Sequence, residues 1–599
     1  MQNLICNRFL DWFCLNYNPD VRMNDQKQGW FCLNRFLPAI ISICVIGTFQ
    51  IDCPAQAIKD RTTSSSSRIQ YKISIDVDYA NASYEGLELV RFTNTGRQDI
   101  DSLNFNIYPN LGVSENDPPL INIKKVSADS RDLKFSFKTR YSSIKVELPV
   151  KLSPGKTIEL TLGFTGNVPR LQREEASLLA HFLQELNDAM SEDKQPRDTR
   201  DIFFAAEESV LLGYFYPVLA APETQLSDQV PAIGVSGIVF SEVADYEVSV
   251  IAADNLTVIG SAQLQPSSLS QQDDRKIEGR LKRVFKGTDL RGFAVILAEK
   301  LKSFEEKIGE QRVISYFREG DEVLGKRALN MAVGSLVCYQ KAFGPYPYPF
   351  FQVVEMPLPA GFSAVEFPSL VALAQAYYID FDRPQSSRLP AVLQEQSDVI
   401  KSSFEFTLAH GVAHQWWGCE VGSDSEKWPY LDESLATFSA AYYHEAAYGK
   451  KLGELIIDQQ LRGTYQAYKM LGGADLEADK PTRDYKNSLQ YTAIVQTKGA
   501  LLLVELREKF GDEKFFNSLR YYYSTHRKQI ARPEHLRYAF LASAEDTREV
   551  RRLFQRWLRE KHADEDITLP DLTLNSQPVS RFRSLGRIFL KIGRAARPF

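Results

Sequence analysis

Two histidines spaced four residues apart are the residues of this sequence best suited to metal chemistry. His410 and His414 lie in segment 408–418, which reads LAHGVAHQWWG. In an α-helix, residues i and i+4 share one face, so both imidazoles can donate a ring nitrogen to one metal ion. Glu433 follows His414 after eighteen intervening residues and offers a third ligand. The spacing therefore predicts one Zn²⁺ held by His410, His414 and Glu433, although two packed core histidines would show the same spacing.

The residues around this trio resemble the aminopeptidase N family of zinc metallopeptidases (the gluzincin clan). That family carries H-E-x-x-H, eighteen further residues and a glutamate, with Gln-Trp after the second histidine and Leu-x-Glu-x-x-Ala around the third ligand. The matching residues here are His414-Gln415-Trp416 and Leu431-Asp432-Glu433-Ser434-Leu435-Ala436. The resemblance implies one zinc ion with these three ligands.

Two further segments extend the resemblance, which runs in order over roughly residues 68–565. Ser363-Ala364-Val365-Glu366-Phe367 corresponds to the family's G-x-M-E-N segment. The acid of that segment binds the free α-amine of the substrate, so the resemblance gives this role to Glu366. An exposed or paired glutamate at a strand edge is the alternative. Tyr491 and Lys498-Gly499-Ala500 match the run that normally carries a catalytic tyrosine.

Two groups that the family's reaction uses are missing. Gly411 stands where the family has the glutamate that acts as general base, and glycine has no side chain to accept a proton. Gln496 stands where the family has the tyrosine that donates to the oxyanion, and a glutamine NH₂ donates with a different reach. Loss of a base costs about 10²–10⁴ in rate and loss of an oxyanion donor about 10²–10³. No catalytic residue is intact, so efficient hydrolysis by the family mechanism is not expected.

Three functions fit these residues. We favour an exported zinc-binding protein whose peptidase activity is lost or strongly reduced and whose cleft binds peptides or a protein partner. The second is an active zinc aminopeptidase that removes N-terminal residues with an unorthodox base. The third is a metal-free structural or assembly factor. The net charge of −5 on 599 residues does not predict a nucleic-acid partner.

The elements that must position these residues fall into a strand-rich part and a helical part. Alternating apolar residues predict a strand over 69–79, and residues 146–152 and 158–164 predict a hairpin around Pro154-Gly155. Helical spacing recurs over 327–343, 397–418, 432–449 and 455–471. Four more helices are expected within 496–562, one of them beginning near Pro533.

The predicted fold is therefore a multidomain α+β chain. We expect an N-terminal antiparallel β saddle or sandwich domain over 68–292, with a helical insertion near 171–200. By resemblance, a thermolysin-like and mainly helical zinc-peptidase domain follows over 293–565. Residues 566–599 would then form a C-terminal loop and a basic tail.

The N-terminus has the composition of an export signal. Residues 36–49 form an apolar run, and Ala55-Gln56-Ala57 provides a small-x-small cleavage pattern after it. We expect residues 1–57 to be a leader or signal peptide, with Met23 as an alternative start. The protein would then be periplasmic, lumenal or extracellular. Five of the seven cysteines lie in this leader, which leaves Cys338 and Cys419 as free thiols or as one disulfide.

The C-terminal stretch 581–597 carries six Arg and Lys residues and no acid. One interpretation is an amphipathic helix that contacts an anionic membrane surface. A solvated tail fits the same residues.

Overall fold

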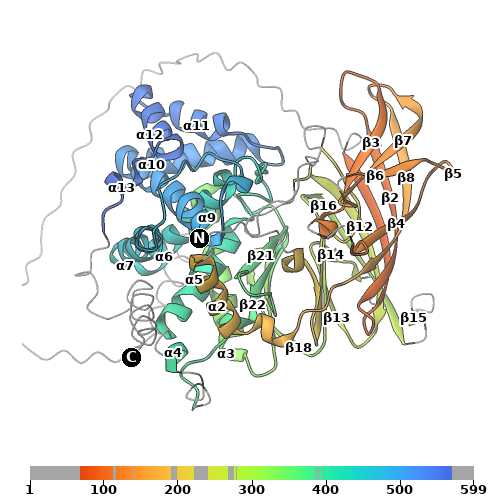
Figure 1. Cartoon of the computed structure of the whole chain (residues 1–599), viewed down its shortest axis with the longest axis horizontal. Helices are drawn as coiled ribbons and strands as arrows, with labels where there is room; N and C mark the ends of the chain where they lie inside the picture. The colour runs from red at the N-terminus through yellow and green to blue at the C-terminus, as the bar shows by residue number, and fades with distance from the viewer. Residues whose placement is uncertain are drawn as a thin grey trace, which may run out of the picture. The chain divides into compact units, whose positions relative to one another are not determined.

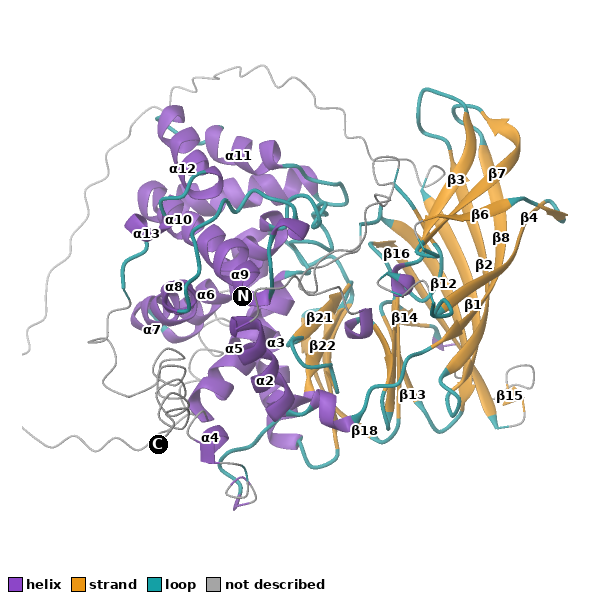
Figure 2. Cartoon of the chain, viewed as in Figure 1, coloured by secondary structure: helices purple, strands orange, loops and turns teal. Residues whose placement is uncertain are grey.

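The computed structural model describes residues 68–569, except for 112, 114, 115, 139, 191–198, 222–239, 267–275, 278, 385, 387, 388, 390, 395 and 396. The predicted leader, Met23 and the basic residues of 581–597 lie outside the described residues. Strands dominate the first part of the described chain and helices the second (Figures 1 and 2), which confirms the predicted α+β fold. Within the described part, no helix combines the length and apolar character needed to cross a membrane.

The largest sheet has nine strands, most of them in the order β14-β16-β12-β1-β2-β8-β4-β5. Apolar side chains on alternate residues of the first strand, such as Tyr71, Ile73 and Ile75, are buried, as the sequence predicts. The pairings are antiparallel except that β1 runs parallel to β12. The strands are β1 (Ile69–Asp78), β2 (Ser83–Thr93), β4 (Ile121–Ala128), β5 (Arg131–Asp132), β8 (Thr157–Asn167), β12 (Ala244–Ala253), β14 (Gln263–Leu264), β15 (Lys276–Ile277) and β16 (Arg280–Leu290).

Two four-stranded sheets accompany it, in the orders β11-β3-β7-β6 and β13-β17-β10-β9. The last strand of these two sheets in chain order, β17, continues this β-rich region past residue 292, and the domain boundary at that residue stays a prediction. The strands are β3 (Ile100–Asn106), β6 (Phe135–Lys138), β7 (Ser143–Leu152), β11 (Val218–Leu219), β9 (Phe203–Ala205), β10 (Ser209–Gly213), β13 (Thr257–Gly260) and β17 (Ala294–Ala298).

The predicted hairpin around Pro154-Gly155 is wrong. Both strands and the turn exist, but β7 pairs with β3 and β6, whereas β8 pairs with β2 and β4 in the large sheet. Asn94 holds the turn between them, because its amide donates to the carbonyl of Leu152 and its backbone carbonyl accepts from the N–H of Gly155. Alternation of apolar residues predicts the buried face of a strand, and it does not predict which strand lies beside it.

A five-stranded sheet begins the helical region, in the order β18-β19-β20-β22-β21. Strand β21 lies at its edge and carries Glu366. Helix α3 packs on β18, β19 and β20, and helix α5 packs on β21 and β22. The elements are β18 (Leu301–Ile308), β19 (Gln311–Arg318), β20 (Phe350–Met356), β21 (Ala364–Phe367), β22 (Leu370–Ala374), α3 (Glu322–Phe343) and α5 (Ser397–Ala413).

The remaining helices follow the predicted order with two differences. Helix α5 ends at Ala413 and not near 418, because the chain turns there into a tight loop in which Gly418 has a φ of +112°. Helix α10 bends at Gly511, whose φ is +71°. Helix α11 begins at Pro533 as predicted, since proline at the first helical position loses no hydrogen bond.

The bounds of these helices complete the description. They are α2 (Leu178–Met190), α4 (Ala391–Gln394), α6 (Tyr430–Tyr448), α7 (Lys450–Ile456), α8 (Gly463–Met470), α9 (Ser488–Tyr491), α10 (Gly499–His526), α11 (Pro533–Leu541), α12 (Thr547–Arg559) and α13 (Ala563–Asp566). Short 3-10 turns are η2 (Tyr108–Asn110), η3 (Arg173–Ala176), η4 (Thr199–Asp201), η6 (Gln375–Tyr377) and η9 (Thr482–Asp484), and π-helical segments are η8 (Ile457–Arg462) and η10 (Thr492–Lys498).

Arg291 joins the β-rich region to the helical region. Its guanidinium is buried and donates to the carbonyl oxygens of Cys419 at 3.3 Å, Gln529 at 3.1 Å and Ser241. One side chain thus satisfies three carbonyls drawn from both regions.

Cys338 and Cys419 are free thiols, so the alternative of a disulfide between them is wrong.

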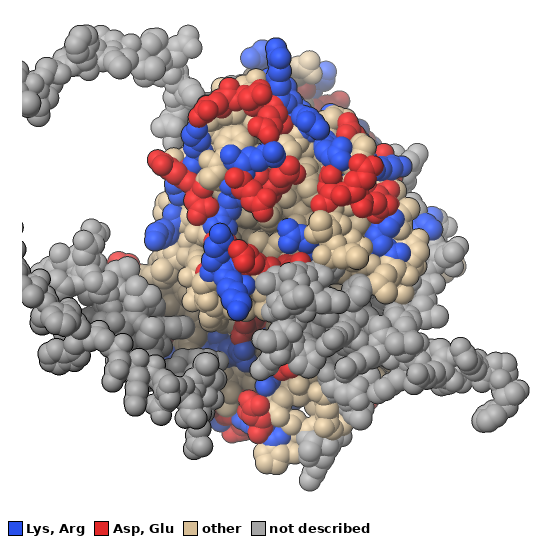
Figure 3. Space-filling model, turned by 90° about the vertical axis from the view of Figure 1, so that its left-hand side faces the viewer, with Lys and Arg blue, Asp and Glu red and all other residues tan. Residues whose placement is uncertain are grey.

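The surface of the helical region carries both signs of charge. On the face shown in Figure 3, Lys and Arg side chains lie among Asp and Glu side chains. This mixed pattern agrees with the small net charge of the chain.

Candidate metal centre

The structure brings the three predicted zinc ligands together at the meeting point of α5 and α6. His410 lies in the last turn of α5, His414 follows directly after it, and Glu433 lies in the first turn of α6. The Nε2 atoms of the two histidines are 2.9 Å apart, and Oε2 of Glu433 lies 3.4 Å from Nε2 of His410 and 3.9 Å from Nε2 of His414. One ligand atom from each residue lies within 4.8 Å of the others.

The second ring nitrogen of each histidine is held by a neighbour. Nδ1 of His414 lies 2.9 Å from the carbonyl oxygen of Trp417, and Nδ1 of His410 lies 3.3 Å from the hydroxyl of Thr437. A carbonyl can only accept, so Nδ1 of His414 carries the proton and its Nε2 lone pair faces the other ligands. The side chains of His410, His414 and Glu433 are 12–15% exposed, which leaves the trio reachable from solvent. Donor set, orientation and access all fit one Zn²⁺ ion.

Carboxylates set the charge of this site. Burial alone would lower the pKa of His414, but Glu366, Glu433 and Asp432 outweigh it and raise that pKa. Burial alone would raise the pKa of Glu433, but His410, His414 and Gln496 outweigh it and lower that pKa. Glu433 is therefore held in the ionised form that a metal ligand needs.

Asp432 stabilises the helix turn that carries Glu433 and is not one of the three candidate ligands. Burial and the neighbouring Glu433 raise its pKa to about 6. Its carboxylate accepts from the hydroxyls of Ser423, at 3.2 Å, and Ser425, and it also accepts from the backbone N–H of Glu433 at 2.8 Å. These bonds fix the first turn of α6, which carries the third ligand.

Gly411 lies on α5 immediately after the first histidine and faces the edge of the five-stranded sheet. A Cβ atom added there would lie 3.1 Å from Oε1 of Glu366 and 3.1 Å from Cγ1 of Val371. Both distances are shorter than ordinary van der Waals contacts between such atoms. The Glu366 carboxylate and the Val371 side chain thus fill the space that a side chain at 411 would enter.

Gln496 lies in the π-helical segment η10, a helix type that is rare and often found at functional sites. Its side-chain Nε2 donates to Oε2 of Glu433 at 2.8 Å, so the amide is engaged by the third ligand. Lys498, in the same segment, is buried and donates to Oδ1 of Asp475 and to the carbonyls of Leu476 and Glu560, each at 2.8 Å. Lys498 therefore anchors η10 to the loop after α8 and to the end of α12. Tyr491, at the end of α9, is buried and packs against Tyr485.

Two positioning residues gave little or no signal in the sequence. Gln415 is buried, accepts from the N–H of Ser369 at 2.7 Å and donates to the carbonyl of Phe367 at 3.1 Å. It ties the loop after α5 to the turn between β21 and β22. The family motif contained Gln415 but gave it no role.

Tyr339 was missed altogether. Its hydroxyl lies 3.0 Å from the carbonyls of both Ala409 and Ser439, which joins α3 to the two helices that carry the ligands. No spacing pattern in the sequence marks such a bridge between three helices.

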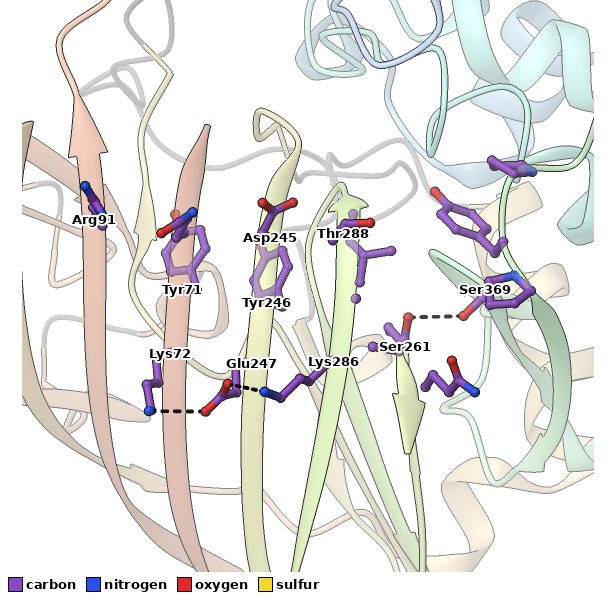
Figure 4. A pocket seen from close by; sticks show the side chains of 18 of the residues that line it. Tyr71, Lys72, Arg91, Asp245, Tyr246, Glu247, Ser261, Lys286, Thr288 and Ser369 are labelled. Atoms are coloured by element: carbon purple, nitrogen blue, oxygen red, sulfur yellow. Dashed lines mark hydrogen bonds and ion pairs between the residues drawn. The ribbon is translucent and has the colours of Figure 1, made fainter. Parts of the chain in front are cut away.

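A cavity of about 560 Å³ lies between the large sheet and the segment 347–350. Figure 4 shows Lys72, Glu247 and Lys286 in a row across neighbouring strands, with Glu247 paired at 3.2 and 2.8 Å. On the other side, the Ser369 hydroxyl donates to the carbonyl of Ser261. These groups are satisfied by one another, and the candidate ligands of the metal centre do not line this cavity.

Comparisons with known proteins agree with the geometry of the trio. Residues 327–557 match the model of the "Peptidase family M1 domain". The chain is 23% identical over 473 residues to "Probable aminopeptidase 2" of Sulfurisphaera tokodaii. This alignment covers 76% of this chain and 49% of that protein. It is 23% identical over 385 residues to "Aminopeptidase M1-D" of Oryza sativa, covering 63% of this chain and 40% of the relative. The chain thus spans about half, or less, of the length of these relatives.

A solved structure supports the fold. The M1 zinc metallopeptidase from Deinococcus radiodurans aligns with a TM-score of 0.52 and 16% identity, covering 86% of this chain and 97% of that one. At this identity the match shows shared architecture, with N-terminal sheets followed by a mainly helical domain. Residues 327–557, which carry His410, His414 and Glu433, are therefore similar to an M1 peptidase domain.

Proposed function

We propose that this protein is an exported zinc-binding member of the M1 family whose hydrolysis of peptides is lost or strongly reduced. In this proposal its cleft binds peptides or a protein partner. The observation that carries it is Gly411, which lies beside an assembled His410, His414 and Glu433 trio and offers no proton acceptor. Zinc, when bound, would polarise a carbonyl group and make water more acidic.

The protein's own residues support binding more than turnover. His410, His414 and Glu433 supply the ligands, and the backbone carbonyl of Trp417 orients one of them. Gln496 is the residue at the family's oxyanion position, but its amide already donates to Glu433. A donor engaged elsewhere stabilises a developing oxyanion less than one aimed at it.

Metal analysis and turnover test the proposal together. We expect about one zinc per chain in the wild type, a large loss in His410→Ala, and turnover of aminoacyl-amide substrates far below the range of about 1–10³ per second that is typical of enzymes. His562→Ala, which changes a histidine outside the site, is the matched control and should retain zinc. Turnover within the typical range would contradict the loss of activity. Less than about a tenth of an equivalent of zinc would favour the metal-free structural factor.

The active aminopeptidase with an unorthodox base is the second candidate function. The observation that favours it is the Glu366 carboxylate beside Gly411. Wild-type turnover on substrates with a free N-terminus, lost in Glu366→Gln, would support this candidate over the first.

Export forms a separate part of the proposal and rests on the signal-like residues 36–57. Mass spectrometry of the protein from its native host should find a mature N-terminus just after Ala57. An intact N-terminus at Met1 or Met23 would contradict a cleaved signal.

A membrane-surface contact through the basic residues of 581–597 is the companion proposal, tested by sedimentation with anionic vesicles.

A further inference from the structure

The side-chain amide of Gln496 contacts the oxygen of Glu433 that faces the two histidines. Its Nε2 donates to Oε2 of Glu433 at 2.8 Å. The same oxygen lies 3.4 Å from Nε2 of His410 and 3.9 Å from Nε2 of His414. A carboxylate oxygen has two lone pairs, so it can accept this bond with one and bind a metal ion with the other. The amide therefore contacts the ligand atom and leaves it free to bind a metal ion.

The segment that carries Gln496 lies directly against the first turn of α6. Ser434, the residue after the third ligand, is buried and donates from its hydroxyl to the carbonyl of Val495 at 2.8 Å. Gly499, at the start of α10, approaches Ser434 so closely that an added Cβ would overlap its hydroxyl oxygen. The two segments are thus in contact before, at and after Gln496.

The other side of η10 is fixed by Lys498. This side chain is buried and donates to three oxygen atoms in the loop after α8 and at the end of α12, each at 2.8 Å. The backbone of η10 is therefore tied both to α6 and to the elements on its opposite side. Such a backbone fixes the place of the Gln496 amide, because only the side-chain torsions remain free.

We propose that Gln496 is a positioning residue of the metal centre. It holds Oε2 of Glu433 at the place from which this oxygen binds zinc together with the two histidines. Hydrogen bonds to ligating carboxylates orient them and contribute to metal affinity. The side chain at position 496 would then act on a metal ligand and not on a bound peptide. The hold on Glu433 stands on the contact itself, and the effect on zinc rests on the proposed function.

A double-mutant cycle on the full chain in excess EDTA tests the hold on Glu433. Gln496→Leu removes the donor, Glu433→Leu removes the acceptor, and the double variant removes both. Each single variant leaves one group of the pair without its partner, whereas the double variant leaves neither. We expect the midpoint of thermal unfolding of the double variant to lie roughly 2 °C above the value obtained by adding the two single losses. Additive losses would overturn the hold.

Zinc affinity, measured by competition with a chelator, tests the effect on the metal. Gln496→Leu should weaken zinc binding about tenfold or more in a chain that has Glu433. In the Glu433→Leu background the same substitution should change the affinity by less than about twofold, because its route to the metal is gone. Thr492→Val, which changes a half-buried residue of the same segment, is the matched control and should keep the wild-type affinity. Unchanged affinity in Gln496→Leu, or an equal loss in both backgrounds, would overturn the positioning role.

Gln496→Asn provides a second variant, and it serves if Gln496→Leu shows no cooperative unfolding. Asparagine keeps the amide but is one methylene shorter, so its donor falls short of Glu433. It should weaken zinc binding as Gln496→Leu does, and wild-type affinity in Gln496→Asn would overturn the role. Absence of zinc from the wild type would instead contradict the proposed function, while the cycle in EDTA would still decide whether Gln496 holds Glu433.

Discussion

Gln415 holds the turn that follows the strand carrying Glu366. Its amide makes two hydrogen bonds to buried backbone groups of the β21–β22 turn. Gln415→Ala leaves both groups without a partner, so we expect the free energy of unfolding to fall by about 2–4 kcal/mol. Denaturant unfolding measures the loss, with Gln555→Ala on the exposed face of α12 as the control. A loss below about 0.5 kcal/mol, the size of an ordinary surface change, would contradict this role.

Glu355 on β20 provides a prediction for pH dependence. Burial and the neighbouring Asp321 raise its pKa from 4.5 to about 8. Between these two values the unfolded chain loses the proton while the folded chain keeps it, so this group lowers stability as the pH rises. Glu355→Gln should remove that decline, and the variant should gain stability relative to the wild type between about pH 5 and 8. Unfolding experiments across this range measure the difference, and a constant difference would contradict it.

At the scale of single residues, the sequence predicts the candidate metal ligands better than it predicts which side chains pack against each other. The i, i+4 spacing and the distance to Glu433 were enough to predict the trio that the structure assembles. The contact between Gly411 and Glu366 could not be predicted, because it depends on how closely α5 approaches the sheet. Such a distance follows from packing of many side chains and leaves no mark in residue spacing.

At the scale of elements, three helices are joined by the hydroxyl of Tyr339, which reaches carbonyls of α5 and α6 from α3. Tyr339→Phe removes the hydroxyl and leaves these buried carbonyls with one donor fewer. We expect a loss of about 1–2 kcal/mol in the free energy of unfolding. Tyr538→Phe, at a position that is 58% exposed, is the control and should change little. Equal effects of the two substitutions would contradict the bridge.

Strand and helix positions were mostly predictable, whereas their partners were not. The alternating residues of β7 and β8 predicted both strands, but the chain passes from one sheet to another at Gly155. The end of α5 was predicted about one turn too late, because His414 to Trp417 keep a helical composition while their backbone turns away. Tertiary contacts decided both outcomes.

At the scale of the whole molecule, Arg291 connects the β-rich and helical regions through three backbone carbonyls. Arg291→Met keeps much of the side-chain volume but removes every donor. We expect a loss of about 3 kcal/mol or more, together with faster proteolysis between the regions. Arg551→Met, on the exposed face of α12, is the matched control. Unchanged resistance to protease would show that Arg291 is not needed for this contact.

The α+β order of the chain was predictable from the change in residue periodicity, since strand spacing gives way largely to helical spacing after β19. The boundary between the regions at residue 292 stays a prediction, and β17, just past it, pairs with strands placed well before it in the sequence. The pairing of distant segments depends on the complete fold.

A zinc-edge anomalous difference map of the full-length protein tests whether the trio holds a zinc ion. We expect one strong peak bounded by Nε2 of His410, Nε2 of His414 and a carboxylate oxygen of Glu433, with the Glu366 side chain beside Gly411. A map of a zinc-soaked crystal without a peak among these three residues, or with its main peak on other ligands, would contradict it.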